Sequence, residues 1–355
     1  MKYIARLKDL RASDVSLAGE KNAFLGDATT MLHHEGILIP GGFAITAEGY
    51  RYFIQENGLQ HKIELLLQAL KRDTGNIHKT GKAIRKLIMR GTFPDILQEE
   101  IITSYRQLGE YVSVAVRSST ANGCHSTPSG KEYADQKGTY LNIYGEQNLL
   151  NTCLKCIASF FADHKIHLFE NQWFEDKNSF ISVGVQPMVR ADLACSGVMI
   201  TVDPKTGFDG VVVIYSAWGL GENIAPGLVT PDKHTVYKPL LTQRDVVPIV
   251  GRDMGSKEIK MVNETGGLFS TQNIETSPEE RGKFCLSDAE VLLLARWGIS
   301  LENHYQNPIY VEWAKDGRSD QLYMVQLHQE VLQEEGEDRH IPHEERELTS
   351  HLTSL

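Results

Sequence analysis

The hydrophobic pattern divides the chain into a helical first part and a strand-rich remainder. Residues 23–110 place apolar side chains at helical spacing, as in HKIELLLQALKR and KAIRKLIMR, with one Pro-Gly-Gly turn at residues 40–42. From residue 111 onward, segments rich in β-branched and aromatic residues are bounded by turn residues, which is typical of strands. These predicted strands are YVSVAVRS, GTYLNIYG, SFISVGVQPMV, SGVMITVD, GVVVIYSAWG, NPIYVEWAKDG and QLYMVQLH.

Two further helical segments, residues 145–172 and 287–305, separate the predicted strands. Because helices and strands do not alternate regularly, the pattern predicts an α+β fold rather than a βαβ wind. Residues 332–355, LQEEGEDRHIPHEERELTSHLTSL, are charged and poor in apolar side chains. We therefore expect this last segment to be a tail or linker outside the folded domain.

Composition narrows the class of protein. A chain of 355 residues that is 41% hydrophobic can bury one large core or two modest ones. Its formal net charge of -10 disfavours nucleic acid or an anionic membrane as the main partner. The sequence has neither the apolar core of a signal peptide nor a run of 18 apolar residues, and its five cysteines lack a disulfide framework spacing. We expect an acidic cytoplasmic enzyme.

One cysteine pair could belong to a metal site. Cys153 and Cys156 form a CxxC, and His164 and His167 follow within the same predicted helix. A zinc site would need a turn between the two pairs, whereas NLLNTCLKCIASFFADHKIHLFEN has continuous helical periodicity without Gly or Pro. The pattern therefore favours a structural helix over a metal site.

Two short motifs could serve a ligand. In SAWGLGENIAPG, Gly219 and Gly221 follow a strand, where they would let the backbone approach a ligand while Glu222 projects a carboxylate. In LAGEKNAFLG, Lys21 lies near a predicted helix start among small residues, where a cation could meet phosphate. Each motif also has a plain interpretation, a tight turn for the first and a solvated lysine for the second.

Residues 307–330, NPIYVEWAKDGRSDQLYMVQLHQE, predict a hairpin with the turn KDGRSD. Strand alternation places two sets of side chains on one face each, namely Tyr310, Glu312 and Ala314 on the first strand and Gln326 and His328 on the second. If the two faces coincide, a carboxylate and an amide oxygen converge, and these are ligands that suit magnesium. The alternative is a buried glutamate paired with a base.

Residues 115–143, AVRSSTANGCHSTPSGKEYADQKGTYLNI, run from the end of one predicted strand to the next. Arg117 stands directly before a run of hydroxyl side chains, and a small polar loop follows that run. Such a loop either holds phosphate or is an ordinary connection.

Many separate blocks resemble the N-terminal ATP-binding region of the phosphoenolpyruvate synthase family, which includes pyruvate phosphate dikinase and rifampin phosphotransferase. The blocks are QPMVRADLACSGVMITVDPKTGFDGVVVIYSAWGLGENIAPGLVTPDKHTVYKP, GEKNAFLG, IPGGFAIT, VAVRSS, GSKEIKMV, FCLSD and VEWAKDG. They occur in the family's order from about residue 16 to about residue 331. The resemblance implies an ATP-grasp fold over residues 1–331, in which lobes of about 1–190 and 191–331 clamp the nucleotide.

The resemblance also implies the cofactors ATP and Mg²⁺ and a set of site residues. It assigns Lys21 and Arg117 as catalytic cations on the phosphates and Thr139 as a residue near the nucleotide. Gln186 and Glu222 would line the nucleotide pocket, and Glu312 and Gln326 would hold the metal. Most of these are residues that the motifs above had already selected, or their neighbours.

The polar loop after Arg117 departs from the family pattern. Family members carry an acidic, proline-containing segment and then Phe-Ala-Gly-Gln before the next strand, whereas here Asp135 occupies the glycine position. The flanking residues that do fit this element are Tyr133, Ala134 and Gln136. Glycine would let backbone N–H groups approach phosphate, while aspartate brings negative charge. A shifted alignment could use Gly130 or Gly138 instead, so phosphate binding by this loop stays open.

A second departure is His328. The family carries arginine two residues after the metal-binding glutamine, and histidine supplies a positive charge there only when it is protonated. The resemblance thus leaves His328 as a cofactor-binding residue whose charge depends on pH.

The resemblance implies phosphoryl transfer in stages. In the family, the β-phosphoryl of ATP goes to a histidine on a mobile domain and then to pyruvate in a third domain. This sequence has neither the glycine- and threonine-rich phosphohistidine motif nor the length for a pyruvate-binding barrel. We expect an ATP-dependent phosphotransferase limited to the first half-reaction, with a phosphohistidine-type acceptor domain or protein as partner. The alternatives are a non-catalytic ATP-sensing or scaffolding domain and a direct small-molecule kinase.

Overall fold

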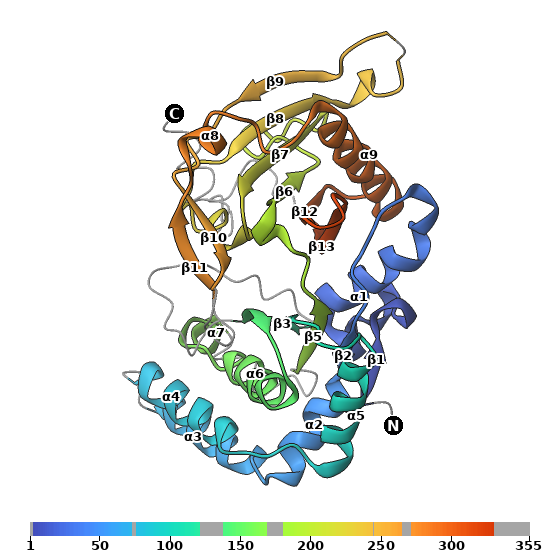
Figure 1. Ribbon diagram of the computed structural model, residues 1–355. Helices are drawn as coiled ribbons and strands as arrows, with labels where there is room; N and C mark the ends of the chain where they lie inside the picture. The colour runs from blue at the N-terminus through green and yellow to red at the C-terminus, as the bar shows by residue number, and fades with distance from the viewer. Residues whose placement is uncertain are drawn as a thin grey trace.

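The computed structural model describes residues 3–72, 76–120, 138–168, 180–243, 245–264 and 271–329. These residues form two lobes, each built on its own β-sheet (Figure 1). The sheet of the first lobe has the strand order β1-β2-β5-β3-β4, and that of the second lobe has the order β13-β12-β6-β7-β8-β9. The predicted α+β fold is confirmed.

The first lobe combines a sheet, whose strands do not follow their order in the sequence, with a layer of helices. Its strands are β1 (Ile4–Arg6), β2 (Phe43–Ile45), β3 (Val114–Thr120), β4 (Thr139–Ile143) and β5 (Ile181–Pro187). Its helices are α2 (Ala47–Glu56), α3 (Gln60–Arg72), α4 (Ile77–Met89), α5 (Asp95–Arg106), α6 (Glu146–Ser159) and α7 (Asp163–Leu168). The helices predicted between residues 23 and 110 are present, and β1 and β2 are short strands that the pattern did not reveal.

The second lobe carries the larger, antiparallel sheet. Its strands are β6 (Cys195–Ile200), β7 (Val211–Trp218), β8 (Asp232–Tyr237), β9 (Ile249–Asp253), β12 (Ile309–Lys315) and β13 (Leu322–Gln329). A separate two-stranded ribbon joins β10 (Ile259–Asn263) to β11 (Thr271–Glu275), and the helices are α8 (Pro278–Arg281) and α9 (Asp288–Tyr305). The sequence pattern did not predict β8 to β11, because polar residues interrupt the apolar ones in each of these strands.

Helix α1 (Val15–Met31) belongs to both lobes. It packs against β3 and β5 of the first lobe and against β13 of the second. Its buried residues Ala18, Leu25 and Ala28 share one apolar cluster with Leu294 and Leu301 of α9. Because this cluster is continuous, α1 forms a packed seam between the two sheets.

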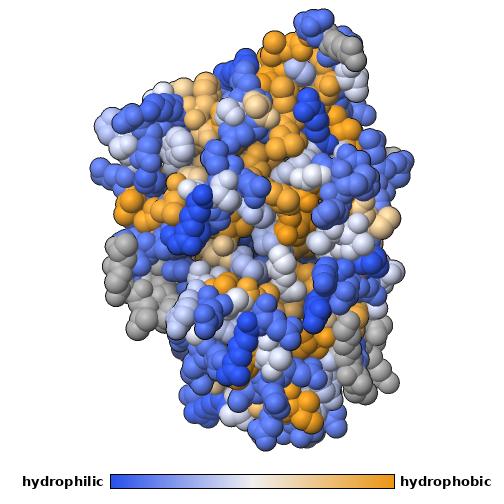
Figure 2. Space-filling view, turned by 45° about the vertical axis from the view of Figure 1, so that its right-hand side comes forward, coloured by the Kyte–Doolittle hydropathy of each residue, from blue (hydrophilic) through white to orange (hydrophobic). Residues whose placement is uncertain are grey.

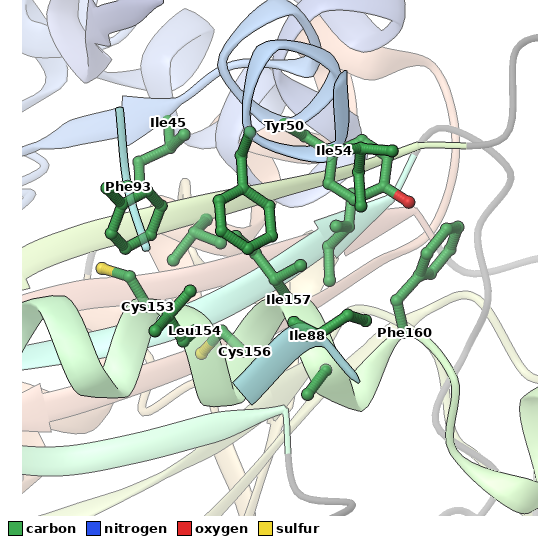
Figure 3. Packing of buried hydrophobic residues seen from close by; sticks show 14 of the residues in the cluster. Ile45, Tyr50, Ile54, Ile88, Phe93, Cys153, Leu154, Cys156, Ile157 and Phe160 are labelled. Carbon is green, nitrogen blue, oxygen red and sulfur yellow. The ribbon is translucent and has the colours of Figure 1, made fainter. Parts of the chain in front are cut away.

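The core of the first lobe contains the CxxC pair. Cys153 and Cys156 are buried, and Figure 3 shows them on α6 among Ile157 and other apolar side chains. Burial raises the pKa of both thiols, which keeps them protonated and unreactive. The side chain of His167 lies outside the described residues. No group of three or more His, Cys, Asp or Glu side chains in the described ranges is arranged to hold a metal ion.

The predicted helix 145–172 is interrupted, so its apparent continuity was wrong. After α6 ends at Ser159, the N–H groups of residues 160–162 bond to carbonyl groups three residues earlier, and α7 begins at Asp163. This tight turn buries both Phe160 and Phe161, which a regular helix would hold about 100° apart. Arg85 of α4 then donates to the Phe161 carbonyl at 2.7 Å and stabilises the break.

The surface shown in Figure 2 is mainly hydrophilic, with hydrophobic residues in separate patches. None of the helices in the described ranges is long and apolar enough to cross a membrane.

Candidate functional site

A cleft of about 640 Å³ lies between the two sheets. Its walls come from β3, β4 and β5 of the first lobe, from β6, β12 and β13 of the second, and from the first part of α1. The sequence-predicted residues that line it are Lys21, Arg117, Thr139, Gln186, Glu222, Glu312 and His328. The remaining one, Gln326, is 7% exposed and bonds to two of them. Residues selected from distant parts of the sequence are therefore brought together.

Arg117 crosses the cleft from the first lobe to the second. Its Nη1 donates to the carbonyl oxygen of Val325 at 2.8 Å, and its Nη2 lies 3.9 Å from Oε2 of Glu312. Its Nε is buried and has no hydrogen-bond partner within the described residues. On the first lobe, Thr139 is the direct neighbour of Arg117 across the β3–β4 pair. The Arg117 guanidinium thus bonds to the second lobe through Nη1, while its Nε–H remains available as a donor among the described residues.

The hairpin of β12 and β13 has the predicted register. Glu312 pairs with Gln326, and Tyr310 pairs with His328. Nε2 of Gln326 donates to Oε1 of Glu312 at 3.1 Å and also lies in hydrogen-bond contact with Nε2 of His328. The carboxylate of Glu312 lies beside the Gln326 amide, as the magnesium interpretation expects. It also lies beside the guanidinium of Arg117, as the interpretation of a glutamate paired with a base expects.

Lys21 reaches the cleft because α1 is kinked. Gly19 has a φ of 73° inside the helix, and any side chain there would collide with Ser119 of β3. A second helical segment begins after this glycine, so Glu20 and Lys21 lie at its start and line the cleft. Lys21 is therefore near a helix start, as predicted.

Gln186 is fixed by the Pro-Gly-Gly turn. Its Nε2 donates to the carbonyl oxygen of Pro40 at 2.9 Å. Gly42 lies so close to the carbonyl oxygen of Val185 that a side chain would not fit. The turn therefore packs directly on β5 and holds Gln186, which is 7% exposed, at the cleft wall.

Glu222 follows a turn that also requires glycine. Gly219 has a φ of 81° and abuts the carbonyl oxygen of Met261, which in turn accepts a hydrogen bond from the Leu220 N–H at 2.9 Å. Asn223 donates from Nδ2 to Oδ1 of Asn273 at 2.8 Å. These contacts dock the β10–β11 ribbon onto the turn that carries Glu222.

An apolar cluster in the same cleft was not predicted from sequence. Its members are Ala191, Leu220 and Ala314, with Leu141, Met188, Val189, Met261 and Val325 packed against them, and all of them line the cleft. Such a surface suits a flat apolar group, while Lys21 and Arg117 suit an anionic one. Met188 and Val189, which directly follow β5, and Leu220, Met261 and Ala314 stand in the blocks that resemble the family, but none of them was singled out as a site residue.

Three other residues at the cationic part of the cleft were missed. Ser118 and Thr120 lie beyond Arg117 on β3, and Lys165 of α7, which is 7% exposed, also lines the cleft. Gly138, the alternative glycine of the polar loop, also lines the cleft, and its carbonyl oxygen accepts the Ser118 N–H at 2.7 Å. Asp135, Gly130 and the rest of that loop lie outside the described residues, as does the segment 332–355.

Comparison with known proteins identifies the family of the chain. The chain matches the family described as pyruvate phosphate dikinase, AMP/ATP-binding domain, over residues 15–349. It is 41% identical to the phosphoenolpyruvate synthase of Synechocystis sp. over 342 residues, which are 92% of this chain and 41% of that protein. The corresponding enzyme of Helicobacter pylori is 40% identical over 346 residues, 94% of this chain and 42% of that protein.

The phosphoenolpyruvate synthase of Aquifex aeolicus is 39% identical over 338 residues, 92% of this chain and 39% of that protein. The chain thus spans about two fifths of the length of these relatives. With its two lobes around one cleft, this ATP-grasp-like chain belongs to the pyruvate phosphate dikinase AMP/ATP-binding domain family.

Proposed function

We propose that the chain binds MgATP in the cleft between its lobes and transfers a phosphoryl group from it to a histidine on a separate domain or partner protein. The observation that carries this proposal is the convergence of Lys21, Arg117 and Glu312 in one cleft that also contains an apolar cluster. The relatives are phosphoenolpyruvate synthases more than twice as long as the matched region. The proposed role is therefore the ATP-dependent half of such a reaction.

The apolar cluster would hold the adenine. Met188 and Val189 directly follow β5, and Leu141 approaches from β4. Gln186 and Glu222 lie on the same cleft wall and would fix the base and ribose through polar contacts. A mostly apolar pocket with a few placed polar groups is the usual form of a small-molecule site.

Lys21 and Arg117 would bind the phosphate oxygens. The unpartnered Nε of Arg117 is a donor in a fixed orientation, since Nη1 of the same group is already bonded to Val325. Phosphoryl transfer depends mainly on positioning and on neutralising charge, and preorganised cations supply both. Both residues would therefore act in catalysis as well as in binding.

Glu312 and Gln326 fit a magnesium ion. Their side chains lie 3.1 Å apart on adjacent strands, and a half-turn of the amide would turn the oxygen of Gln326 toward the carboxylate. Mg²⁺ commonly takes one or two protein oxygens and completes its shell with water and substrate phosphates. When held by these two side chains, the ion would supply positive charge that offsets the charge of the phosphates.

A transfer experiment tests the proposal. The chain is incubated with Mg²⁺ and ATP labelled at the β- or the γ-phosphate, with and without the part of the Synechocystis enzyme that lies outside the matched region. We expect AMP, inorganic phosphate formed when water accepts the γ-phosphoryl group, and an acid-labile label on the added protein derived from the β-phosphate. We expect little ATP consumption by the chain alone. Sustained ADP formation without the added protein would favour a direct kinase. Binding of ATP without any transfer would favour the ATP-sensing alternative.

A further inference from the structure

Asn22, the residue after Lys21 on α1, is a buried polar side chain at the junction of the two lobes. Only 6% of it is exposed, and α1 packs there against β3 and β5 of the first lobe (Figure 1). The motif LAGEKNAFLG pointed to Lys21 and not to Asn22. A buried amide is stable only when it is hydrogen-bonded, so the partners of Asn22 show what it holds in place.

Asn22 bonds to a pair of serines on two neighbouring strands. Its Nδ2 donates to Oγ of Ser182 on β5 at 3.1 Å, and its backbone N–H donates to Oγ of Ser119 on β3 at 3.4 Å. Ser119 and Ser182 are direct partners in the register of the β3–β5 pair, and both are buried. One residue of α1 is therefore bonded to both of the strands on which the helix packs.

Two further hydrogen bonds fix the orientation of this amide. Oγ of Ser182 donates to the carbonyl oxygen of Ile45 on β2 at 2.7 Å, so this hydroxyl accepts from Asn22 with its lone pairs. Nδ2 of Asn22 also donates to the carbonyl oxygen of Ala18 at 3.0 Å. Because Ala18 precedes the kink at Gly19 and Asn22 follows it, this bond joins the two sides of the kink in α1.

Asn22 also contacts the part of the sheet that carries Arg117. Gly184 is the direct partner of Arg117 across the β3–β5 pair, and a Cβ at Gly184 would collide with Oδ1 of Asn22. The absence of a side chain at Gly184 thus lets the amide approach the backbone opposite Arg117. Ser119, which accepts from the Asn22 N–H, lies two residues after Arg117 on β3. Residues two apart point to the same side of a strand, so Arg117 leaves β3 on the side that α1 covers.

We propose that Asn22 is a positioning residue that sets the placement of Lys21 relative to Arg117. This inference rests on the proposed function, because it assumes that these two cations bind phosphate in the cleft. Lys21 adjoins Asn22 in the chain, and Lys21 and Arg117 both line the cleft. Two cations bind one polyphosphate best when their separation already matches that of its oxygens, so a support shared by both preorganises the site.

A double-mutant cycle on the full chain tests the inference, with ATP affinity measured by titration calorimetry in the presence of Mg²⁺. We expect Asn22→Ala to weaken ATP binding about tenfold in the parent. In a Lys21→Met background, the same substitution should change ATP binding less than about twofold, because Asn22 then has no second cation to place. A purely structural role of Asn22 would give the same factor in both backgrounds, since the free-energy changes of independent substitutions add.

Two further variants cover the case in which Asn22→Ala does not fold. Ser182→Ala removes an acceptor of the Asn22 amide and leaves Asn22 in place. We expect it to weaken ATP binding about threefold in the parent and to have no measurable effect in the Lys21→Met background. Asn57→Ala is the matched control, because the Asn57 amide bonds the end of α2 to the Thr92 carbonyl oxygen at 2.9 Å and lies outside the cleft lining. It should leave ATP affinity within about twofold of the parent.

Three results would overturn the inference. If Asn22→Ala binds ATP as tightly as the parent, Asn22 does not place the cations, and the proposed function still stands. If Asn22→Ala, or Ser182→Ala in its stead, weakens ATP binding by the same factor with and without Lys21, Asn22 has only a structural role, and the proposed function again stands. If the parent itself does not bind ATP, the proposed function fails together with the inference.

Discussion

Arg117 and Val325 are joined by a 2.8 Å hydrogen bond between a guanidinium on β3 and a backbone carbonyl on β13. The two residues belong to different sheets and are 208 positions apart in the sequence. The same guanidinium lies 3.9 Å from Glu312 and carries a buried Nε that has no hydrogen-bond partner among the described residues. A phosphate bound by Arg117 would therefore be coupled to the relative position of the two lobes, since one side chain serves both contacts.

The first prediction concerns this coupling. Arg117→Lys keeps the positive charge but removes the planar fork that can hold Val325 and a phosphate oxygen at once. We expect ATP affinity to fall about 10- to 100-fold, which corresponds to the loss of one or more charge-assisted hydrogen bonds. Titration calorimetry measures the change. Arg106→Lys is the control, because Arg106 forms an exposed ion pair with Glu146 away from the cleft. Equal ATP affinity in the parent and in Arg117→Lys would contradict the assignment.

The second prediction concerns the metal. With Glu312→Gln, we expect Mg²⁺ to lose most of its effect on ATP binding, because a neutral amide replaces the only carboxylate in the Glu312–Gln326 pair. In the parent, ATP with Mg²⁺ at about 100 times its dissociation constant should stabilise the fold by about 2.7 kcal/mol. Thermal melts with ATP, with and without Mg²⁺, measure this difference.

The control for the metal prediction is Glu279→Gln. Glu279 is an exposed carboxylate that forms an ion pair with Lys283, and it does not line the cleft. This variant should keep the full response to Mg²⁺. If Glu312→Gln responds to Mg²⁺ as the parent does, the ion is bound elsewhere.

The β12–β13 hairpin could be predicted from the sequence, whereas the position of Lys165 at the cleft could not, and the difference has a physical reason. Period-2 alternation and a turn fix which residues of β12 and β13 face each other, so Glu312 and Gln326 could be paired from local sequence. The start of α7, the helix that carries Lys165, is anchored by Arg85, which lies 78 positions before Asp163. Contacts over that distance leave no periodic signal in the sequence.

The break between α6 and α7 was hidden for a related reason. Phe160 and Phe161 fit the apolar pattern of a helix, and no Gly or Pro marks the turn. The turn forms because both rings can be buried in the core of the first lobe. Tertiary burial therefore decided the local structure, and a sequence pattern that scores one helix face at a time could not detect it.

The third prediction concerns a buried ion pair that braces the second lobe. Lys257 and Asp232 contact each other with both side chains fully buried. Asp232 also accepts the backbone N–H groups of Gly255 and Cys285, each at 2.9 Å. Lys257→Met would leave this carboxylate buried without its cation, so we expect the free energy of unfolding to fall by about 3–5 kcal/mol. Urea unfolding measures the loss.

The control for the ion pair is Lys283→Met, which removes an exposed lysine from an i,i+4 pair on the surface. Its free energy of unfolding should change by less than about 1 kcal/mol. A loss of similar size in Lys257→Met and Lys283→Met would show that the Asp232 pair does not brace the lobe.

The last prediction concerns acid sensitivity. Burial lowers the pKa of His164 to about 4 and also lowers that of His234 from the ordinary value of 6.5. Below about pH 6.5 the unfolded chain therefore binds protons at these histidines that the folded chain does not. The stabilising contribution of each neutral histidine is present above its unfolded pKa and is lost as the pH falls toward the folded value.

We expect the urea midpoint of the parent to fall between about pH 7 and about pH 5 more steeply than that of His164→Gln, because glutamine removes one of the two linked sites. The variant His33→Gln, which changes an exposed histidine, should follow the parent. If His164→Gln and the parent give parallel curves, His164 is protonated as easily in the folded chain as in the unfolded one, and burial does not lower its pKa.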